Sequence, residues 1–420
     1  MKTDLNALVN DFTVLYKNGQ YDRALEVLNE ALKIAEKTLG PDDPKVATIL
    51  HRLAVLYHTQ RQYTKAEEAC KRAIAISEKA LGPDHPEVIV KLIFIADIYK
   101  SQGQHSQAEQ VYKRLVSTNE KKLGPEHPET AFCLSLLALS LADQQQYDES
   151  EKIYKRALKI FEKAIGTDNP ETASCLDGLA HLYEKQKLYE KAEPLYKRLL
   201  TMREKALGPE HPDVGQSMES LANLYVKEKL YAKAEPLYKR VLAIKEKTLG
   251  MEHPNVAVYL NIIAEHYAAQ GEYAQAEPLY KRALAIYEKT SDPNRPNEPM
   301  AMCLHHLAKL NQLQQKYKAA ETLYKRALSI REKSEAEADK LQLAILLSDL
   351  AGLYTAQSQY AKAEPLYKQA LASGETLLDP NHPFLTYFLM GLAGLYGKTG
   401  REKEAAALEQ RATQIRDTKR

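Results

Sequence analysis

Five histidines recur in one local sequence context and could serve as metal ligands. Each precedes a proline at the end of a segment such as Leu-Gly-Pro-Asp-His or a close variant of it: His85, His127, His211, His253 and His382. Zinc requires ligand nitrogens at about 2 Å, whereas equivalent residues of adjacent helical repeats stand roughly 8–10 Å apart. A histidine here can instead cap the helix that starts at the following proline. We expect helix caps and no metal site.

The four cysteines could form disulfides or bind metal, but their spacing argues against both. Cys133, Cys175 and Cys303 share one place in a sequence repeat, and no two of the four cysteines form a Cys-x-x-Cys pair. A disulfide needs Cα atoms closer than about 7 Å, which neighbouring repeats do not offer. We expect small buried packing residues in a reducing compartment, and therefore a cytoplasmic protein.

Seven Lys-Arg pairs could form a basic track for nucleic acid or a solvated helix surface. The pairs begin at Lys71, Lys113, Lys155, Lys197, Lys239, Lys281 and Lys325. Each lysine follows a glutamate by four residues, as Lys197 follows Glu193. Such pairs stabilise a helix surface by about 0.2–0.5 kcal/mol each. Because the formal net charge is only +2, we expect a solvated face and no nucleic-acid partner.

His305, His306 and Lys309 could form a catalytic cluster. One helix offers them no nucleophile with an orienting partner, and the chain lacks Gly-rich phosphate loops, His-Glu-x-x-His and Gly-x-Ser-x-Gly motifs. We expect no enzymatic activity and no cofactor. No run of about 18 apolar residues occurs, so we expect no membrane insertion, and the early acid Asp4 argues against a signal peptide.

A repeat of 42 residues must position these side chains. A tyrosine marker, once replaced by histidine and once by glutamate, recurs at Tyr21, Tyr63, His105, Tyr147, Tyr189, Tyr231, Tyr273, Tyr317, Tyr360 and Glu402. Small residues, mostly alanine, recur nine residues before the marker and three after it, as Ala180 and Ala192 flank Tyr189. Large apolar residues around them follow the three-and-four spacing of helices. We predict an all-α protein of about ten helix-turn-helix units.

The segment between units indicates where helices begin and end. In the third unit Gly82 suits the end of one helix, and Pro86 suits the first turn of the next. We predict a first helix over about 86–102 and a second over about 105–123. The turn at 291–299 is longer, and the one near 333–341 lacks glycine and proline. We therefore predict a regular array over residues 1–290 and less regular units with a C-terminal capping helix over 291–420.

The pattern Leu-Ala-x-Leu-Tyr, followed by Tyr-x-x-Ala-Glu-Pro-Leu-Tyr-Lys-Arg-x-Leu, resembles the tetratricopeptide repeat. The 42-residue period and the Leu-Gly-Pro-Glu-His-Pro turn are similar to the kinesin light chain subclass. The resemblance extends over residues 11–412 and implies a right-handed superhelical solenoid. Kinesin light chains carry a coiled coil before their repeats, whereas the repeats here start almost at once, so the chain is most similar to free-standing bacterial repeat proteins. Of the paired asparagines that meet the ligand backbone in that family, only Asn261 has a counterpart here.

Solenoids bind partners on a concave face lined mainly by the first helix of each unit. Here the inward positions lie fifteen, twelve, eight and five residues before the marker, which form one helical stripe. The predicted groove residues from these positions and their neighbours are His51, Arg52, His58, Ile93, Asp97, Lys100, Phe132, Leu139, Asp177, His181, Glu184, Glu219, Asn223, Asn261, Glu265, His305 and Lys309. The alternative interpretation is that they are solvated residues in an unoccupied groove.

The groove predicts a scaffold that binds a peptide or protein segment. Two other functions stay open: a sensor or regulatory subunit of a signalling system, and an accessory subunit of a secretion or assembly machine. The stripe is acidic at Asp177, Glu184, Glu219 and Glu265, so we expect a bound segment to present lysine or arginine there. Kinesin light chain repeats favour acidic peptides, so the resemblance and the residues disagree on this point.

Overall fold

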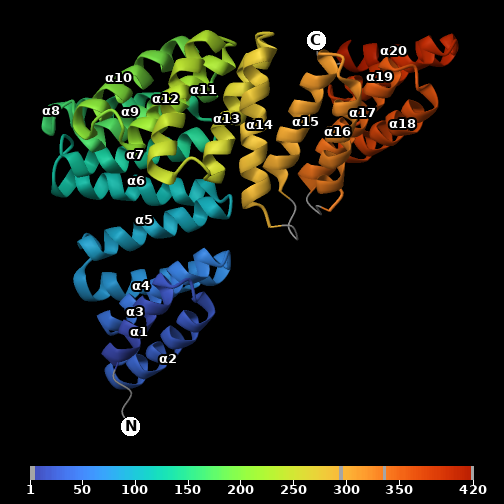
Figure 1. Cartoon of the computed structure of the whole chain (residues 1–420). Helices are drawn as coiled ribbons and strands as arrows, with labels where there is room; N and C mark the ends of the chain where they lie inside the picture. The colour runs from blue at the N-terminus through green and yellow to red at the C-terminus, as the bar shows by residue number, and fades with distance from the viewer. Residues whose placement is uncertain (1–4, 293–296, 334–336, 418–420) are drawn as a thin grey trace. The chain divides into compact units, whose positions relative to one another are not determined.

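The structure, a computed structural model, describes residues 5–292, 297–333 and 337–417, and within them it contains helices and no strands (Figure 1). The predicted helical class is therefore confirmed. The first helices of the units are α1 Leu5–Lys17, α3 Pro44–Thr59, α5 Pro86–Ser101, α7 Pro128–Asp143, α9 Pro170–Lys185, α11 Pro212–Lys227, α13 Pro254–Ala269, α15 Glu298–Leu313, α17 Glu337–Ala356 and α19 Leu385–Lys398. The second helices are α2 Tyr21–Leu39, α4 Tyr63–Leu81, α6 His105–Lys122, α8 Tyr147–Ala164, α10 Tyr189–Leu207, α12 Tyr231–Leu249, α14 Tyr273–Thr290, α16 Tyr317–Arg331, α18 Tyr360–Leu377 and α20 Glu402–Asp417.

The residue before each proline-initiated helix caps it, as the sequence predicts. Nδ1 of His85 accepts a hydrogen bond from the backbone N–H of Glu87 at 3.3 Å. The Asp43 carboxylate accepts a hydrogen bond from the backbone N–H of Lys45, and the Asn169 amide oxygen accepts one from the backbone N–H of Glu171. The following proline stands where its missing N–H costs no helical hydrogen bond. His85, His127, His211 and His253 are thus helix caps. The expectation fails for His382, because α19 begins only at Leu385 and His382 accepts a hydrogen bond from the N–H of Phe384 before it.

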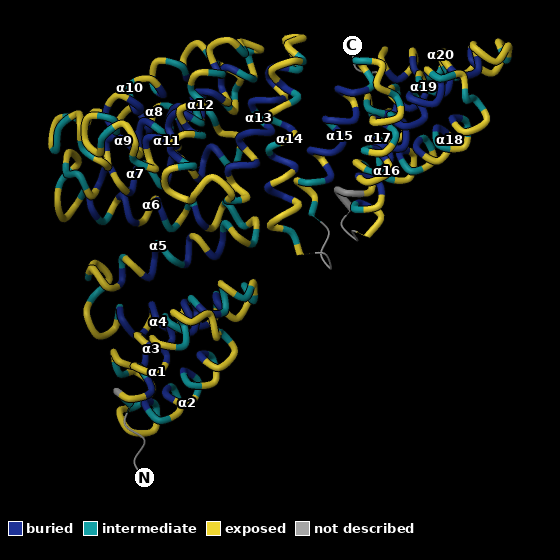
Figure 2. The backbone as a smooth tube through the Cα atoms, in the orientation of Figure 1, coloured by how far each residue is buried: buried dark blue, intermediate teal, exposed yellow. Residues whose placement is uncertain are grey.

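Small residues let the two helices of a unit pack closely, and large ones fill the space beside them. Ala180 on α9 and Ala192 on α10 are both fully buried. The tyrosine seven residues after the marker, such as Tyr196, is also buried. Burying one large side chain stabilises the fold by about 1.5–3 kcal/mol. Buried and exposed residues alternate along each helix (Figure 2), as expected for helices with one packed face.

The chain divides into two compact units, residues 1–206 and 207–420. The first unit contains α1 to α9 and nearly all of α10, and the second contains α11 to α20. The boundary predicted at residues 290–291 falls inside the second unit and stays a prediction, as does the handedness of the superhelix. The two irregular turns that motivated that boundary lie partly outside the described residues, at 293–296 and 334–336.

Candidate functional site

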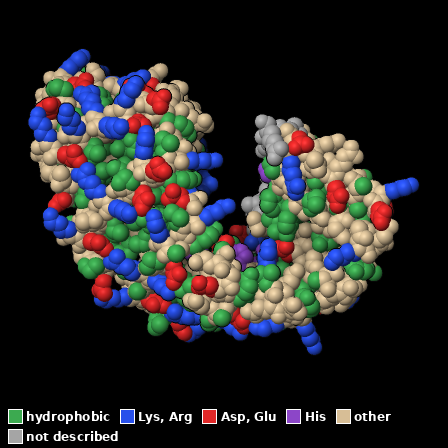
Figure 3. All heavy atoms as spheres, turned by 90° about the horizontal axis from the view of Figure 1, so that it is seen from above, with side chains coloured by type: hydrophobic (Ala, Val, Ile, Leu, Met, Phe, Trp, Pro, Cys, Tyr) green, Lys and Arg blue, Asp and Glu red, His purple; other side chains and the backbone are tan. Residues whose placement is uncertain are grey.

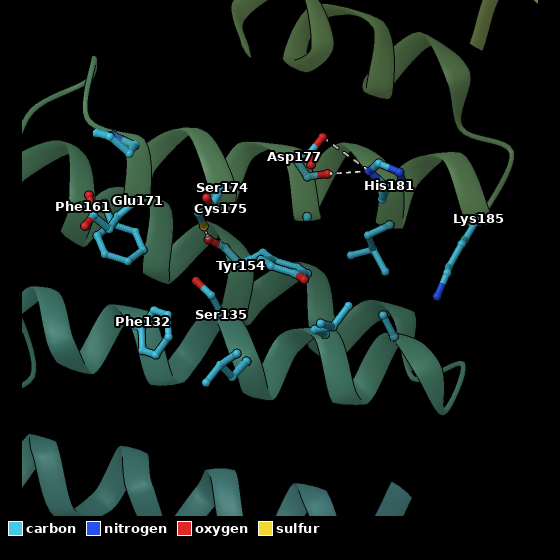
Figure 4. A pocket seen from close by; sticks show the side chains of 16 residues that line it. Phe132, Ser135, Tyr154, Phe161, Glu171, Ser174, Cys175, Asp177, His181 and Lys185 are labelled. Atoms are coloured by element: carbon cyan, nitrogen blue, oxygen red, sulfur yellow. Dashed lines mark hydrogen bonds and ion pairs between the residues drawn. The ribbon is translucent and has the colours of Figure 1, made fainter. Parts of the chain in front are cut away.

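The first unit holds an open pocket of about 570 Å³ between the neighbouring helices α7 and α9. Helix α8 forms its floor with Tyr154 and Phe161. In Figure 4, Phe132 and Ser135 project from α7, Asp177 and His181 from α9, and Tyr154 lies between the two helices. Four predicted groove residues, Phe132, Leu139, Asp177 and His181, thus come together around one cavity.

Gly178 on α9 leaves the space in which Tyr154 forms the floor of this pocket. A Cβ atom on Gly178 would stand 2.7 Å from the hydroxyl oxygen of Tyr154. Because glycine has no Cβ, the tyrosine ring can lie directly beside α9. The walls of the pocket are apolar and open to solvent: Phe132 is 46% exposed and Leu139 is 38% exposed. Apolar side chains grouped on an open surface are typical of interaction sites.

Asp177 and His181 form a polar edge along α9. Nδ1 of His181 lies 3.1 Å from the carbonyl oxygen of Asp177 and 3.6 Å from its carboxylate. The hydrogen bond to Asp177 raises the pKa of His181, more than burial lowers it. This edge can therefore carry a charged imidazolium beside a carboxylate at mildly acidic pH. Glu184, farther along α9, accepts a hydrogen bond from the Tyr196 hydroxyl at 2.6 Å.

An ion pair network crosses three first helices at the other end of the pocket. Asp143 on α7 lies 3.3 Å from Nζ of Lys100 on α5 and 3.0 Å from Nζ of Lys185 on α9. Burial raises the pKa of Asp143, but hydrogen bonds from the two lysines outweigh burial and lower the pKa overall. One carboxylate thus faces two cations, which leaves this end of the pocket with an excess of positive charge.

The predicted residues on α3 and α5 do not line the pocket, and two of them, His58 and Asp97, lie close to each other. The ring of His51 packs edge-on against Phe94, with 5.2 Å between centroids. Nε2 of His58 lies 2.9 Å from the Ser101 hydroxyl and 3.8 Å from the carboxylate of Asp97. Ile93 is half-buried. The guanidinium of Arg52 stacks over the ring of Phe12 on α1, 5.5 Å from the ring centroid.

In the second unit, three predicted residues, Asn223, Glu219 and Glu265, act on Tyr238 of α12. Its hydroxyl donates to the amide oxygen of Asn223. Burial raises the pKa of Tyr238 most, and the carboxylates of Glu219 and Glu265 raise it further. Glu219 accepts a hydrogen bond from the Tyr259 hydroxyl at 2.6 Å. A further predicted groove residue, Asn261 on α13, is buried and only 3% exposed.

His305 and Lys309 on α15 converge on Asp349 of α17. Nε2 of His305 lies 2.6 Å from the Asp349 carboxylate, and Nζ of Lys309 lies 3.8 Å from it. The hydroxyl of Tyr387 on α19 donates to the other carboxylate oxygen. This arrangement holds three successive first helices together.

Sequence reasoning missed Asp143, Lys185, Tyr154, Phe161 and Asp349. Asp143 and Lys185 lie four residues before their markers and Asp349 lies eleven before its marker, and none of these is a stripe position. Tyr154 and Phe161 belong to second helices, which the expected stripe does not include, and Tyr154 lies against Gly178. The glycine at Gly178 was the one local signal for this.

The Lys-Arg pairs are engaged with acids across the described residues. Nζ of Lys155 lies 2.6 Å from Glu151 in the same helix, and Arg156 reaches Glu120 of the preceding unit at 2.6 Å. Figure 3 shows blue and red side chains close together over the face in view. The predicted solvated Glu–Lys face is therefore confirmed. Among the described helices, none is both long and apolar enough to cross a membrane.

Solved structures similar to this chain are helical repeat proteins. A putative kinesin light chain from Podosopora anserina with nearly identical repeats shares 24% identity at a TM-score of 0.44, covering 48% of this chain and 95% of that one. BtubC (BKLC) from P. vanneervenii shares 20% sequence identity at a TM-score of 0.45, and the match covers 55% of this chain and 89% of that one. The apo form of RapI shares 13% sequence identity at a TM-score of 0.46, and the match covers 68% of this chain and 98% of that one. No curated protein sequence matches the chain.

A family model matches the sequence in seven overlapping segments: residues 13–76, 47–121, 132–205, 178–247, 217–289, 254–333 and 341–418. Together they cover most of the chain. The model is that of the tetratricopeptide repeat. Repeats of this kind support a general role as a protein-interaction scaffold. The chain belongs to the tetratricopeptide repeat family.

Proposed function

We propose that this chain binds a segment of a partner protein and that the pocket between α7 and α9 anchors one large apolar side chain of that segment. The supporting observation is the pocket itself: about 570 Å³, open to solvent, with Phe132 and Leu139 on its wall and Tyr154 on its floor. Its volume falls in the range of about 300–1,000 Å³ that is usual for ligand pockets. We propose a binding role rather than a catalytic one.

The surroundings of the pocket suit an extended segment. Helices α5, α7 and α9 are successive first helices, and the Lys100–Asp143–Lys185 network connects them beside the pocket. Such a network fixes the spacing of the helices before the ligand arrives, which lowers the ordering cost of binding. The rest of the segment can then lie along α5, past Asp97, where polar side chains are exposed.

The four cysteines suit a reducing compartment. Cys70, Cys133, Cys175 and Cys303 are all buried and free. Burial raises the pKa of Cys133 and of Cys175 to about 11, which keeps both thiols protonated and unreactive near neutral pH. We therefore place the protein in the cytoplasm.

A selection experiment tests the proposed function. Peptides are selected from a random display library on the intact chain, and the selected pool is passed over a Leu139→Glu variant. We expect the selected peptides to share a large apolar residue and to be lost on this variant, because a carboxylate on the wall opposes burial of an apolar side chain.

The control variant is Leu123→Glu. Leu123 follows α6 and is 37% exposed, against 38% for Leu139, but it lies outside the pocket. Peptides that bind both variants as well as the unaltered chain would show that the pocket is not the binding site.

A further inference from the structure

The polar edge of the pocket consists of two groups one helical turn apart on α9. Asp177 and His181 both line the pocket, and Nδ1 of His181 lies 3.6 Å from the Asp177 carboxylate. In Figure 4 the His181 ring lies beside the Asp177 side chain. Within the described residues, the Asp177 carboxylate has no ion-pair partner other than His181. The charge of this edge therefore depends on whether His181 carries a proton.

A proton reaches His181 without any opening of the fold, because its side chain is 54% exposed. The hydrogen bond to Asp177 raises the pKa of His181 from its ordinary value of 6.5, burial lowers it, and the charges of Asp177 and Glu184 raise it further. The net direction is upward. Such an imidazole changes its charge near neutral pH. Protonation therefore alters the wall of the pocket and leaves the core as it is.

The other titratable groups around His181 keep their charge near neutral pH. Burial raises the pKa of Tyr154 and of Tyr196, so both hydroxyls stay neutral. The Tyr196 hydroxyl donates to Glu184, and Lys185 pairs with Asp143. Within the first unit, the titratable and charged groups that surround His181 are Asp177, Glu184 and Lys185 on α9, Tyr196 on α10, Tyr154 on α8 and Asp143 on α7.

The combination of Asp177 and His181 occurs once along the chain. Only on α9 does an acid stand twelve residues before the marker together with a histidine eight residues before it. Another histidine and acid of the groove, His58 and Asp97, lie 3.8 Å apart on two different helices and do not line the pocket. A charge change on this stripe near neutral pH is therefore specific to the pocket between α7 and α9.

We propose that His181 is a specificity residue of the pocket that a proton controls: a partner segment with a lysine beside its apolar anchor binds while His181 is neutral and is weakened once His181 is protonated. The proposal rests on the proposed function, because it takes the occupant of the pocket to be such a segment. At high pH the lysine ammonium faces the Asp177 carboxylate. At low pH it faces an imidazolium that already pairs with Asp177, and like charges across an interface oppose binding.

The opposite end of the pocket does not change its charge in this range. Burial raises the pKa of Asp143, but Lys100 and Lys185 outweigh burial and lower it overall, so the carboxylate stays ionised. Two lysines facing one carboxylate leave this end positive. A lysine of the bound segment is therefore directed toward the Asp177 edge, where the charge of His181 decides its affinity.

The test uses one peptide selected on the unaltered chain and synthesised in three forms, with Lys, Gln or Glu next to its apolar residue. Fluorescence anisotropy measures the affinity of each form at about pH 8 and about pH 6, within the range in which histidine changes its charge. We expect the Lys form to bind about fivefold more weakly at the lower pH. The Gln form should change little, and the Glu form should bind more tightly.

The variant His181→Gln keeps a polar side chain but cannot take up a proton. It should bind the Lys form with the same affinity at both pH values. The control is His85→Asn, because His85 caps α5 outside the pocket and asparagine serves the same purpose at Asn169. The control should keep the full pH dependence of the unaltered chain.

Proton NMR of the His181 ring gives a readout that a purely structural role would not move. Because binding and protonation are linked, the Lys form should lower the pKa of His181 and the Glu form should raise it. The ring resonance of His181 is identified by its loss in His181→Gln. If that variant does not fold, the three peptide forms and a pH titration of the histidine resonances of the unaltered chain decide the question.

The proposal is overturned if the Lys form needs the pocket but binds equally at both pH values, or if a folded His181→Gln variant keeps the pH dependence. Either result leaves the proposed function intact. If the Lys form binds Leu139→Glu as well as it binds the unaltered chain, the proposed function fails and this proposal fails with it.

Discussion

The hydroxyl oxygen of Tyr154 on α8 lies 2.7 Å from the point where a Cβ on Gly178 of α9 would stand. Two further ring atoms lie at 2.8 Å, and Tyr154 is only 3% exposed. The ring therefore has little room to move aside. This one contact forms the floor of the pocket between α7 and α9 and makes the identity of residue 178 decisive.

Replacing Gly178 with alanine should destabilise the first unit. Alanine favours a helix by about 1 kcal/mol over glycine, but overpacking a filled core costs about 1–3 kcal/mol. We expect the thermal midpoint to fall or stay level, and peptide binding to weaken. Gly394→Ala is the control: nothing lies within 4 Å of its Cβ, so stability should rise. A rise in both variants would contradict the packing described here.

The turn between the two helices of a unit requires a left-handed residue. Lys187 has a φ of 60° there, and Gly103 takes the same place in another unit with a φ of 73°. Because a side chain in this conformation costs about 1 kcal/mol or more, Lys187→Gly should raise stability by up to about 1 kcal/mol. Lys159→Gly, in the middle of α8, should lower it by about 1 kcal/mol. Urea unfolding followed by circular dichroism would measure both, and equal losses would rule out strain at Lys187.

Acid should destabilise the second unit through His306. Burial, and then the charges of His305 and Lys309, lower its pKa from 6.5 to about 4. The unfolded chain therefore binds a proton between pH 6.5 and 4 that the folded chain does not. Stability is full above pH 6.5 and should fall by up to about 3 kcal/mol as the pH drops to 4.

The variant His306→Phe removes this proton uptake. Its unfolding free energy should depend less steeply on pH than that of the unaltered chain over the same interval. His85→Asn serves as the control, since His85 is a cap near the surface. An unchanged slope in the phenylalanine variant would show that other groups cause the acid sensitivity.

The acidic residues of the second unit predict a basic ligand segment. Glu219 and Glu265 both raise the pKa of Tyr238, after the larger effect of burial. The double variant Glu219→Lys and Glu265→Lys should slow association of a lysine- or arginine-rich peptide, most strongly at low salt. Stopped-flow kinetics at two salt concentrations would measure this. An unchanged association rate at low salt would mean that these acids are solvated surface.

Local patterns predicted the helices well because each cue acts within a few residues. The caps at His85 and Asn169, the prolines that follow them and the small residues at Ala180 and Ala192 all appear in the structure as expected. These features depend on hydrogen bonds and close contacts whose partners are near in the sequence or recur in every unit.

The pocket was harder to predict because it depends on contacts between neighbouring helix-turn-helix repeats. Gly178 reveals a cavity only when it is paired with Tyr154, which lies 24 residues earlier on another helix. The partner of Lys100, Asp143, lies 43 residues later and one position outside the expected stripe. A repeat-by-repeat comparison of the position eleven residues before the marker would have found the glycines Gly178 and Gly391.

The most direct test of the central claim is photocrosslinking from the pocket between α7 and α9. A photoreactive benzoylphenylalanine replaces Phe132, and the chain is irradiated with a peptide selected on the unaltered chain. A second variant carries the same group at Met251, which is 61% exposed in a turn of the second unit. The account predicts crosslinking from residue 132, at the apolar residue of the peptide, and none from residue 251. Equal crosslinking from both positions, or none from residue 132, would contradict it.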